Sequence, residues 1–232
     1  DGYTLLVHSS GYAVNPTLSA NAGYDGEKDF VPISIVASQP NFIVVHADFP
    51  AKTLAELIAR AKTEKLAFAS AGNGTTPHLT GENLFKVRAK VDITHIPYNS
   101  GAQAIVDLLA DRLDAMFLVI PPIKGHVDSG KLLALATLND KRLQQFPNLP
   151  TMIELGLPKV TNAVWFGYLA PGQTPQPIID KLAGAFAKLQ SDAALVKRIA
   201  DLGAQLDIVG PTEFGKIIEQ DRSRYGKIVA ER

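Results

Sequence analysis

The 232-residue chain contains no cysteine, which removes disulfides, thiol catalysis and cysteine-based zinc sites from consideration. It also lacks an excess of either charge, because 23 basic residues balance 23 acidic ones. We therefore expect no nucleic-acid partner and no attraction to an anionic membrane surface. No apolar run approaches the length of a membrane-spanning helix. The chain is 46% hydrophobic, which allows a proper core in one large or two small domains.

The first residues, Asp1-Gly2-Tyr3, lead at once into an apolar run at positions 4–7 that is typical of a strand. They include no methionine and no signal peptide. We therefore expect further sequence upstream of Asp1.

Short apolar runs alternate along the chain with segments that carry helix-capping residues. Capping boxes stand at Thr53–Glu56, Ser100–Gln103 and Thr151–Glu154. The last third is expected to be helical, with helices that start near positions 174, 192 and 212. This alternation predicts an α/β fold with a mostly parallel sheet.

The strongest functional signal is the stretch from Ala67 to Glu82. An apolar strand ends here in Ser70-Ala71-Gly72-Asn73-Gly74, and Thr75 or Thr76 then stands where a helix should be capped. Unpaired N–H groups and the positive dipole end of such a helix suit a carboxylate or a phosphate. The glycines would let a ligand approach the backbone closely. A plain strand-to-helix turn built from small residues remains the alternative.

Polar loops at 8–11, 70–76 and 98–102 all follow predicted strands, and ligands of α/β sheets gather at the carboxyl ends of strands. The loop at 70–76 is neither a Walker loop nor a dinucleotide fingerprint. No Gly-x-Ser-x-Gly elbow surrounds Ser9, Ser10 or Ser70, and no calcium loop is present. We therefore expect a binding site without a catalytic set, a metal or a cofactor.

A series of short motifs identifies a known family, and it runs in order along nearly the whole chain. The motifs are Asp1-Gly2-Tyr3-Thr4-Leu5-Leu6, Asn15-Pro16, Lys28-Asp29-Phe30, Pro32-Ile33, Ala69-Ser70-Ala71-Gly72-Asn73-Gly74-Thr75, His78-Leu79, His95-Ile96-Pro97-Tyr98, Gly130-Lys131-Leu132, Pro150-Thr151, Glu154-x-Gly156 and Trp165-Phe166-Gly167. Through them the chain resembles the extracytoplasmic substrate-binding proteins of tripartite tricarboxylate transporters, the Bug family.

The resemblance implies a periplasmic binding protein of type II, with two α/β lobes, a hinge and a central ligand cleft. Residues 1–40 plus 165–232 would form the first lobe, and residues 41–164 the second. The implied function is non-catalytic. The lobes would close around a small organic acid that bears a carboxylate, and the protein would deliver it to membrane transporter subunits. We expect a monomer in the periplasm.

The resemblance also implies which residues hold the carboxylate. We add His78 to these residues because it lies in the first helical turn after the loop. Local hydrogen bonding is the alternative to ligand contact for this side chain. The expected site residues are Ser9 and Ser10 in the first lobe, and Ser70, Asn73, Thr75, Thr76, His78, Ser100 and Gly101 in the second.

Two departures from the family pattern bear on the ligand. The family's first strand, Gly-rich loop and helix do not precede Asp1, so the expected site would be half of the family's site. Leu118 stands after Met116-Phe117 where family members often carry Asp. This favours a monocarboxylate or an aromatic acid over an amino acid. The alternative functions are a hydrolase or transferase that uses the same anion-binding loops, and a ligand-sensing subunit.

Overall fold

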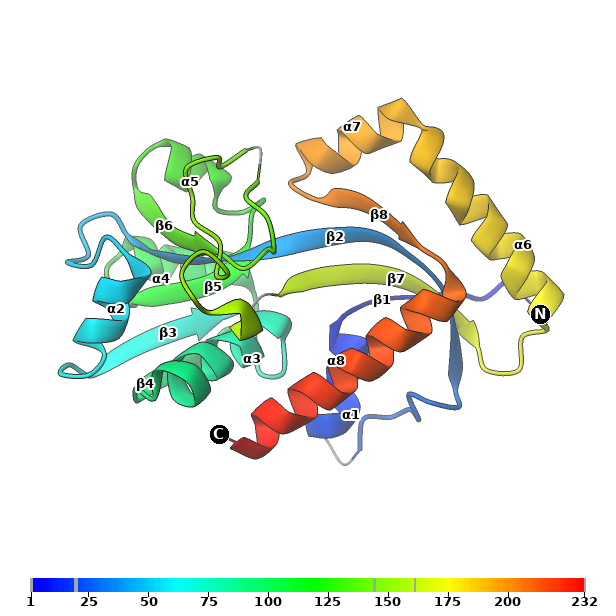
Figure 1. The fold of residues 1–232 in the computed structure, drawn as a ribbon, viewed down its shortest axis with the longest axis horizontal. Coiled ribbons are helices and arrows are strands. Elements are labelled where there is room, and N and C mark those ends of the chain that lie inside the picture. The colour runs from blue at the N-terminus through cyan, green and yellow to red at the C-terminus, as the bar shows by residue number, and fades with distance from the viewer. Residues whose placement is uncertain (1, 19–20, 144, 161, 232) are drawn as a thin grey trace. The chain divides into compact units, whose positions relative to one another are not determined.

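The computed structural model describes residues 2–18, 21–143, 145–160 and 162–231 (Figure 1). The chain divides into two compact units. The first contains the segments 1–39 and 164–230, and the second consists mainly of Pro40–Ala163. Within the described part of the chain, no helix is both long and apolar enough to cross a membrane.

The second unit contains a five-stranded region of sheet in the order β6-β2-β5-β3-β4. Strand β3 pairs in parallel with β4 and β5, and β2 runs antiparallel to both β5 and β6. Strands β3 to β6 therefore end at the same edge, which is where α/β sheets bind ligands. The strands are β2 (Phe30–His46), β3 (Leu66–Ser70), β4 (Ile93–Pro97), β5 (Ala115–Val119) and β6 (Leu132–Thr137).

Helices cover both faces of this sheet. Ala115 and Phe117 of β5 belong to one buried cluster, and Met116 and Leu118 belong to the other, as expected for a strand buried on both sides. The first cluster is completed by α2 (Leu54–Arg60) and by the π-helical segment Asn83–Ala89, which continues α3 (Thr76–Glu82). The second is completed by α4 (Gly101–Leu109) and α5 (Lys124–Asp128). A 3₁₀ turn, Pro158–Val160, follows later in the chain.

Local capping fixes several helix starts in this unit. Thr53 Oγ1 accepts the Glu56 N–H, and the Glu56 carboxylate accepts the Thr53 N–H, so the capping box of α2 is confirmed. The Thr151–Glu154 pair forms the same two hydrogen bonds but starts a turn rather than a helix. Capping residues thus form their local hydrogen bonds in both places, whereas the sequence that follows decides whether a helix propagates.

The first unit contains antiparallel strand pairs, contrary to the expectation of a mostly parallel sheet. Strand β1 (Leu6–Ser9) pairs antiparallel with β7 (Ala163–Pro171), and β8 (Gln205–Val209) pairs antiparallel with the first half of β2. The expectation that the last third is wholly helical was wrong at β8. The alternation of polar and apolar residues over Gln205-Leu206-Asp207-Ile208 was a local strand signal, but it covers only one short segment. The partner strand lies far away in sequence, so the pairing itself could not be predicted.

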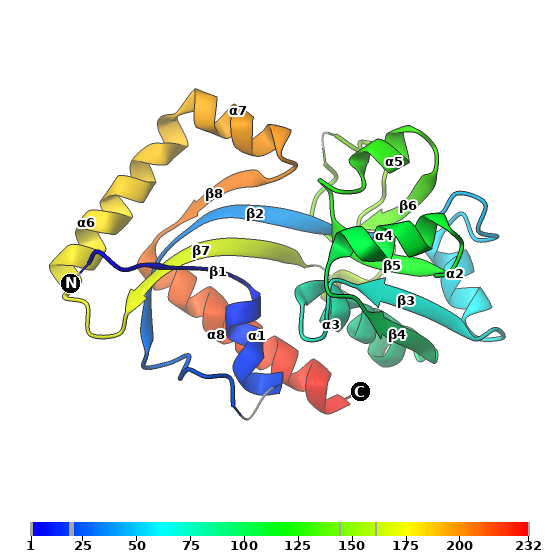
Figure 2. The same cartoon turned by 180° about the vertical axis from the view of Figure 1, so that it is seen from behind.

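Helices pack on both faces of β7 as well. Trp165 and Leu169 contact a cluster that includes Tyr12 and Phe214, whereas Tyr168 and Ala170 belong to a cluster that includes Ile179. The helices are α1 (Gly11–Leu18) and α8 (Pro211–Glu231) on the first face and α6 (Gln176–Ala187) on the second, with α7 (Ala193–Asp201) after a 3₁₀ turn at Lys188–Ser191 (Figures 1 and 2). The motif Asn15-Pro16 lies inside α1.

A buried carboxylate ties α8 to β7. The only tryptophan, Trp165, donates its Nε1–H to Asp221 at 2.8 Å, and Arg224 donates to the other carboxylate oxygen at 2.7 Å. Burial raises the pKa of Asp221, although both partners oppose that rise. Because the folded-state pKa is raised, this group favours the fold at low pH, and its contribution is lost as the pH rises through the folded-state value.

Asp221→Asn is therefore expected to gain stability relative to the wild type as the pH rises. The Asn oxygen can still accept from Trp165, while the buried charge is gone. The measurement is the melting temperature of both proteins, followed by Trp165 fluorescence between about pH 4.5 and 7.5. A difference in melting temperature that stays constant over this range would contradict the assignment.

Candidate functional site

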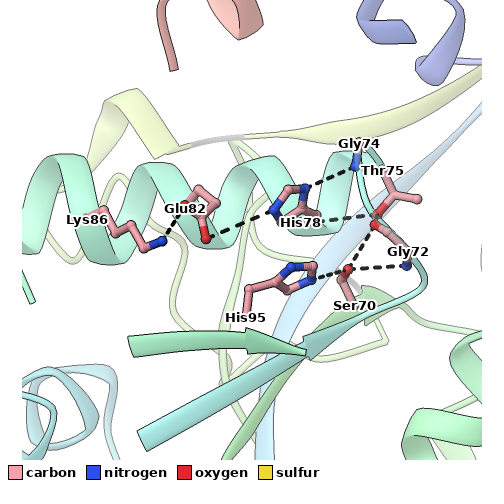
Figure 3. Close-up of polar contacts among 8 residues, drawn as sticks. All are labelled: Ser70, Gly72, Gly74, Thr75, His78, Glu82, Lys86 and His95. Atoms are coloured by element: carbon pink, nitrogen blue, oxygen red, sulfur yellow. Dashed lines mark hydrogen bonds and ion pairs between the residues drawn. The ribbon is translucent and has the colours of Figure 1, made fainter. Parts of the chain in front are cut away.

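The loop between β3 and α3 is closed by its own side chains (Figure 3). The Gly72 carbonyl accepts the Thr75 hydroxyl at 2.8 Å and lies 3.1 Å from the Ser70 hydroxyl. Thr75 is the N-cap of α3, because its Oγ1 accepts the His78 N–H at 3.4 Å. The loop turns at Gly72 and Gly74, whose φ angles of 130° and 76° are accessible mainly to glycine.

Ser70 is fully buried at the end of β3. Its hydroxyl lies 2.8 Å from Nε2 of His95 on β4, and it also accepts the Gly72 N–H at 3.3 Å. The hydroxyl is thus committed to holding the first half of the loop against the sheet.

His78 lies beneath the second half of the loop and is only 4% exposed. Its Nδ1 accepts the Gly74 N–H at 3.0 Å, and its ring stacks on His95 with centroids 4.0 Å apart. On its other side, Nε2 lies 4.0 Å from the Glu82 carboxylate, which pairs with Lys86 at 2.9 Å. The structure therefore places the predicted ligand contact in the interior, where its ring supports the loop.

A second strand-end loop lies beside the first. Ser70 is opposite Pro97 in the β3–β4 pairing, and the Tyr98 N–H donates to the Ser70 carbonyl at 3.1 Å. A side chain added at Gly72 would meet the Tyr98 carbonyl at 3.4 Å. This second loop runs into α4, where Ser100 is the N-cap and accepts the Gln103 N–H at 3.4 Å.

The two adjacent loops present unpaired donors. Within the part of the chain that the structure describes, the backbone N–H groups of Asn73, Gly101 and Ala102 have no hydrogen-bond partner. Asn73 and Ser100 are exposed, whereas Thr76 is buried. Unpaired N–H groups next to helix starts can bind an anion by hydrogen bonds alone.

Tyr98 is held by a carboxylate on α4. Its hydroxyl donates to Asp107 at 2.7 Å, and Arg112 donates to the same carboxylate at 3.1 Å. The hydrogen bond from Tyr98 and then Arg112 lower the pKa of Asp107. Asp107 therefore stays ionised at neutral pH and orients the aromatic ring beside the loop.

Ser9 and Ser10 belong to the first unit. Ser9 ends β1 opposite Phe166, and Ser10 is fully buried, with its N–H donating to the Trp165 carbonyl at 3.1 Å. The expected loop at 8–11 is thus a tight connection, because α1 starts at Gly11. Both serines stand at the end of a strand and the start of a helix, as the residues of the second unit do.

A cavity of about 540 Å³ opens elsewhere in the second unit, beside β6. Its wall is mainly apolar and includes Leu133, Leu135 and Phe146, with Lys52 at its border. None of the predicted site residues lines it. We place the candidate site at the loops after β3 and β4 because the free donors are there.

The sequence did not single out His95 and Glu82 as members of the site. His95 lies two residues after the buried Ile93 on β4, and this period-2 spacing only places both on the same face of the strand. Glu82 lies four residues after His78, a spacing that puts both on one face of a helix. The spacing of Glu82 from His78 was available in the sequence, whereas the place of His95 in the site depended on the register of β3 against β4.

A family model described as "Tripartite tricarboxylate transporter family receptor" matches residues 1–232. The chain belongs to this family. Protein BugT of Bordetella pertussis is 35% identical over 235 residues, which cover all of this chain and 72% of that protein. The family resemblance seen in the sequence motifs is confirmed.

Solved structures of similar proteins support the same assignment for this receptor-family chain. An R. palustris protein solved with adipate is 29% identical with a TM-score of 0.88, covering 100% of this chain and 78% of that one. MatC from Rhodopseudomonas palustris, solved with bound malate, is 28% identical with a TM-score of 0.85, covering 99% and 80%. The mixed α/β fold thus matches that of solute-binding proteins.

Proposed function

We propose that this protein is a periplasmic receptor that captures a small carboxylate-bearing organic acid and passes it to the membrane subunits of a tripartite transporter. The observation that carries the proposal is the pair of adjacent strand-end loops in the second unit, with free N–H groups at Asn73, Gly101 and Ala102. Membership of the receptor family, and relatives solved with malate and adipate, support the carboxylate.

Neutral donors would hold the anion in this site. The loops at 70–76 and 98–102 contain no lysine or arginine, so hydrogen bonds from amides and hydroxyls supply the binding energy. Helix starts add a favourable field for negative charge. Such a site selects a small carboxylate by the geometry of its donors rather than by a salt bridge.

We further propose that the ligand carries no ammonium group. The same two loops contain no acidic side chain that could pair with one, and Leu118 packs in the core, 3% exposed. A buried or half-buried ammonium group without a partner would weaken binding strongly. Monocarboxylates, dicarboxylates and aromatic acids are therefore expected to bind better than amino acids.

The test is a thermal-shift scan against malate, adipate, benzoate, glutamate and inorganic phosphate. A ligand at 100 times its dissociation constant stabilises by about 2.7 kcal/mol, or roughly 5–10 °C for a chain of this length. We expect a shift of this size from at least one acid without an ammonium group, with the acid recovered unchanged. Shifts from glutamate alone would contradict the proposed ligand class, and shifts from phosphate alone would contradict a carboxylate receptor.

One observation bears on the enzyme alternative: Ser70 and His95 are 2.8 Å apart, as a nucleophile and its base would be. However, Ser70 is fully buried and its hydroxyl is engaged by the loop backbone. A serine-reactive fluorophosphonate, added to the same protein in a separate labelling experiment, is therefore expected to leave Ser70 unlabelled. Labelling of Ser70, or turnover of an ester, would favour a hydrolase.

A further inference from the structure

Two stacked imidazole rings hold the two halves of the loop at 70–75 (Figure 3). His95 contacts the Ser70 hydroxyl at 2.8 Å where the loop begins, and His78 accepts the Gly74 N–H at 3.0 Å where it ends. The rings lie 4.0 Å apart and within 24° of parallel. His78 is buried, so water does not substitute for these contacts.

The contact with Gly74 fixes the protonation state of His78. A backbone N–H can only donate to a nitrogen that carries a lone pair, so Nδ1 is unprotonated and the ring proton is on Nε2. Adding a proton to Nδ1 would bring two donors face to face and break the contact. His95 differs, because a serine hydroxyl can either donate or accept.

One ion pair lies beside His78. The Glu82 carboxylate lies 4.0 Å from Nε2 of His78 and favours a charged ring, but Lys86 pairs with the same carboxylate at 2.9 Å. From the neighbouring strand, the His95 ring opposes a second charge at a stacking distance of 4.0 Å. The hydrogen bond from the Gly74 N–H also opposes a positive charge on His78, because it needs the lone pair of Nδ1. The shape of the loop therefore depends on whether Nδ1 of His78 carries a proton.

We propose that His78 is a positioning residue and that, with His95, it forms a proton-sensitive clamp on the loop at 70–75. The loop keeps its shape while His78 is neutral, and acid releases the Gly74 N–H and disorders the donors next to Asn73. The clamp rests on the proposed function in one respect: the loop it controls is the one assigned to carboxylate binding. Ligand would then be held at neutral pH and released in acid.

The binding test uses malate and adipate as probes at about pH 8 and pH 5, a range that spans histidine titration. The affinity of the wild type is expected to fall at least about tenfold between them, which is 1.4 kcal/mol. His78→Asn keeps an acceptor near Nδ1 but cannot titrate, so its affinity, whatever its value at pH 8, should change little with pH. His78→Leu lacks the acceptor and should bind weakly at both pH values.

His46→Asn is the matched control. His46 Nδ1 also accepts a backbone N–H two residues on, from Asp48 at 3.2 Å, but in a turn at the far end of β2. This variant should keep the full pH dependence of the wild type. Equal pH dependence in the wild type and His78→Asn would overturn the clamp, because the titration of the ligand itself is the same for both.

A second readout does not need a ligand. Nitrogen-15 spectra of the histidine rings should show the proton of His78 on Nε2 at pH 8. Hydrogen exchange at the Gly74 amide, corrected for its intrinsic pH dependence, should accelerate at least about tenfold at pH 5 in the wild type but not in His78→Asn. A proton on Nδ1 at pH 8, or unchanged exchange, would overturn the proposal. If this readout succeeds and no carboxylate binds, the proposed function fails while the clamp stands.

Discussion

Gly172→Ala is expected to destabilise the protein by about 3 kcal/mol, the upper end of the usual cost of overpacking. Gly172 follows β7, and its N–H donates to the Asp29 carbonyl at 2.7 Å. A β-carbon at this position would lie 1.9 Å from the carbonyl oxygen of Lys28. Both partners are backbone, so no change of rotamer relieves the overlap, and the hydrogen bond that joins the two segments must open.

The measurement is the melting temperature, which should fall by roughly 6–12 °C at about 2–4 °C per kcal/mol for this length. Gly184→Ala is the matched control in the same unit. It lies in α6 with nothing within 4 Å of an added β-carbon. Alanine is the better helix former, so the control should gain about 0.5–1 kcal/mol. Equal melting temperatures for the two variants would show that the Gly172 contact is not real.

Gly72→Ala is expected to weaken carboxylate binding at least about tenfold, equivalent to 1.4 kcal/mol. The φ of 130° at Gly72 lies in a region that is almost closed to other residues, which costs about 1–3 kcal/mol for alanine. The added carbon would also press on the Tyr98 carbonyl at 3.4 Å. Since the Gly72 carbonyl anchors Thr75, the loop should lose the shape that presents the Asn73 amide.

Gly130→Ala serves as the control for backbone strain. Gly130 also has a positive φ of 70°, but nothing lies within 4 Å of an added β-carbon, and it follows α5 rather than β3. Its replacement should cost about 1–2 kcal/mol of stability and leave affinity unchanged. Calorimetric titration with the acid identified by the thermal-shift scan measures the affinity of both variants, and the melting temperature measures their stability. A tenfold loss in both variants would mean that stability, not the loop, limits binding.

Several helix starts and the nature of the main loop were determined by the sequence alone. Thr53 and Ser100 each cap a helix where the capping pattern predicted one, and Asp192 caps the helix expected to start near position 192. The turn formers after Ser70 form the predicted strand-to-helix loop. These signals are reliable because a cap and the amide it satisfies lie within three residues of each other. The family motifs were equally readable, and the family match confirms them.

The assignment of site residues to the ligand stays a prediction, but the structure sorts those residues by burial. Asn73 and Ser100 are exposed, whereas Ser70, Thr76 and His78 are buried and support the backbone. A sequence pattern cannot make this distinction. All five are polar residues in or beside short loops, and their burial depends on which segments pack over them.

Tertiary structure alone decided which distant segments meet. The parallel register of β3 with β4 brings His95 to Ser70 and His78, and the antiparallel partner of β8 is the first half of β2, more than 150 residues earlier in the chain. Strand pairing depends on side-chain packing across the whole sheet rather than on local preference. The sequence therefore determined the loop that we propose binds the anion, while the fold determined the two histidines that hold this loop in place.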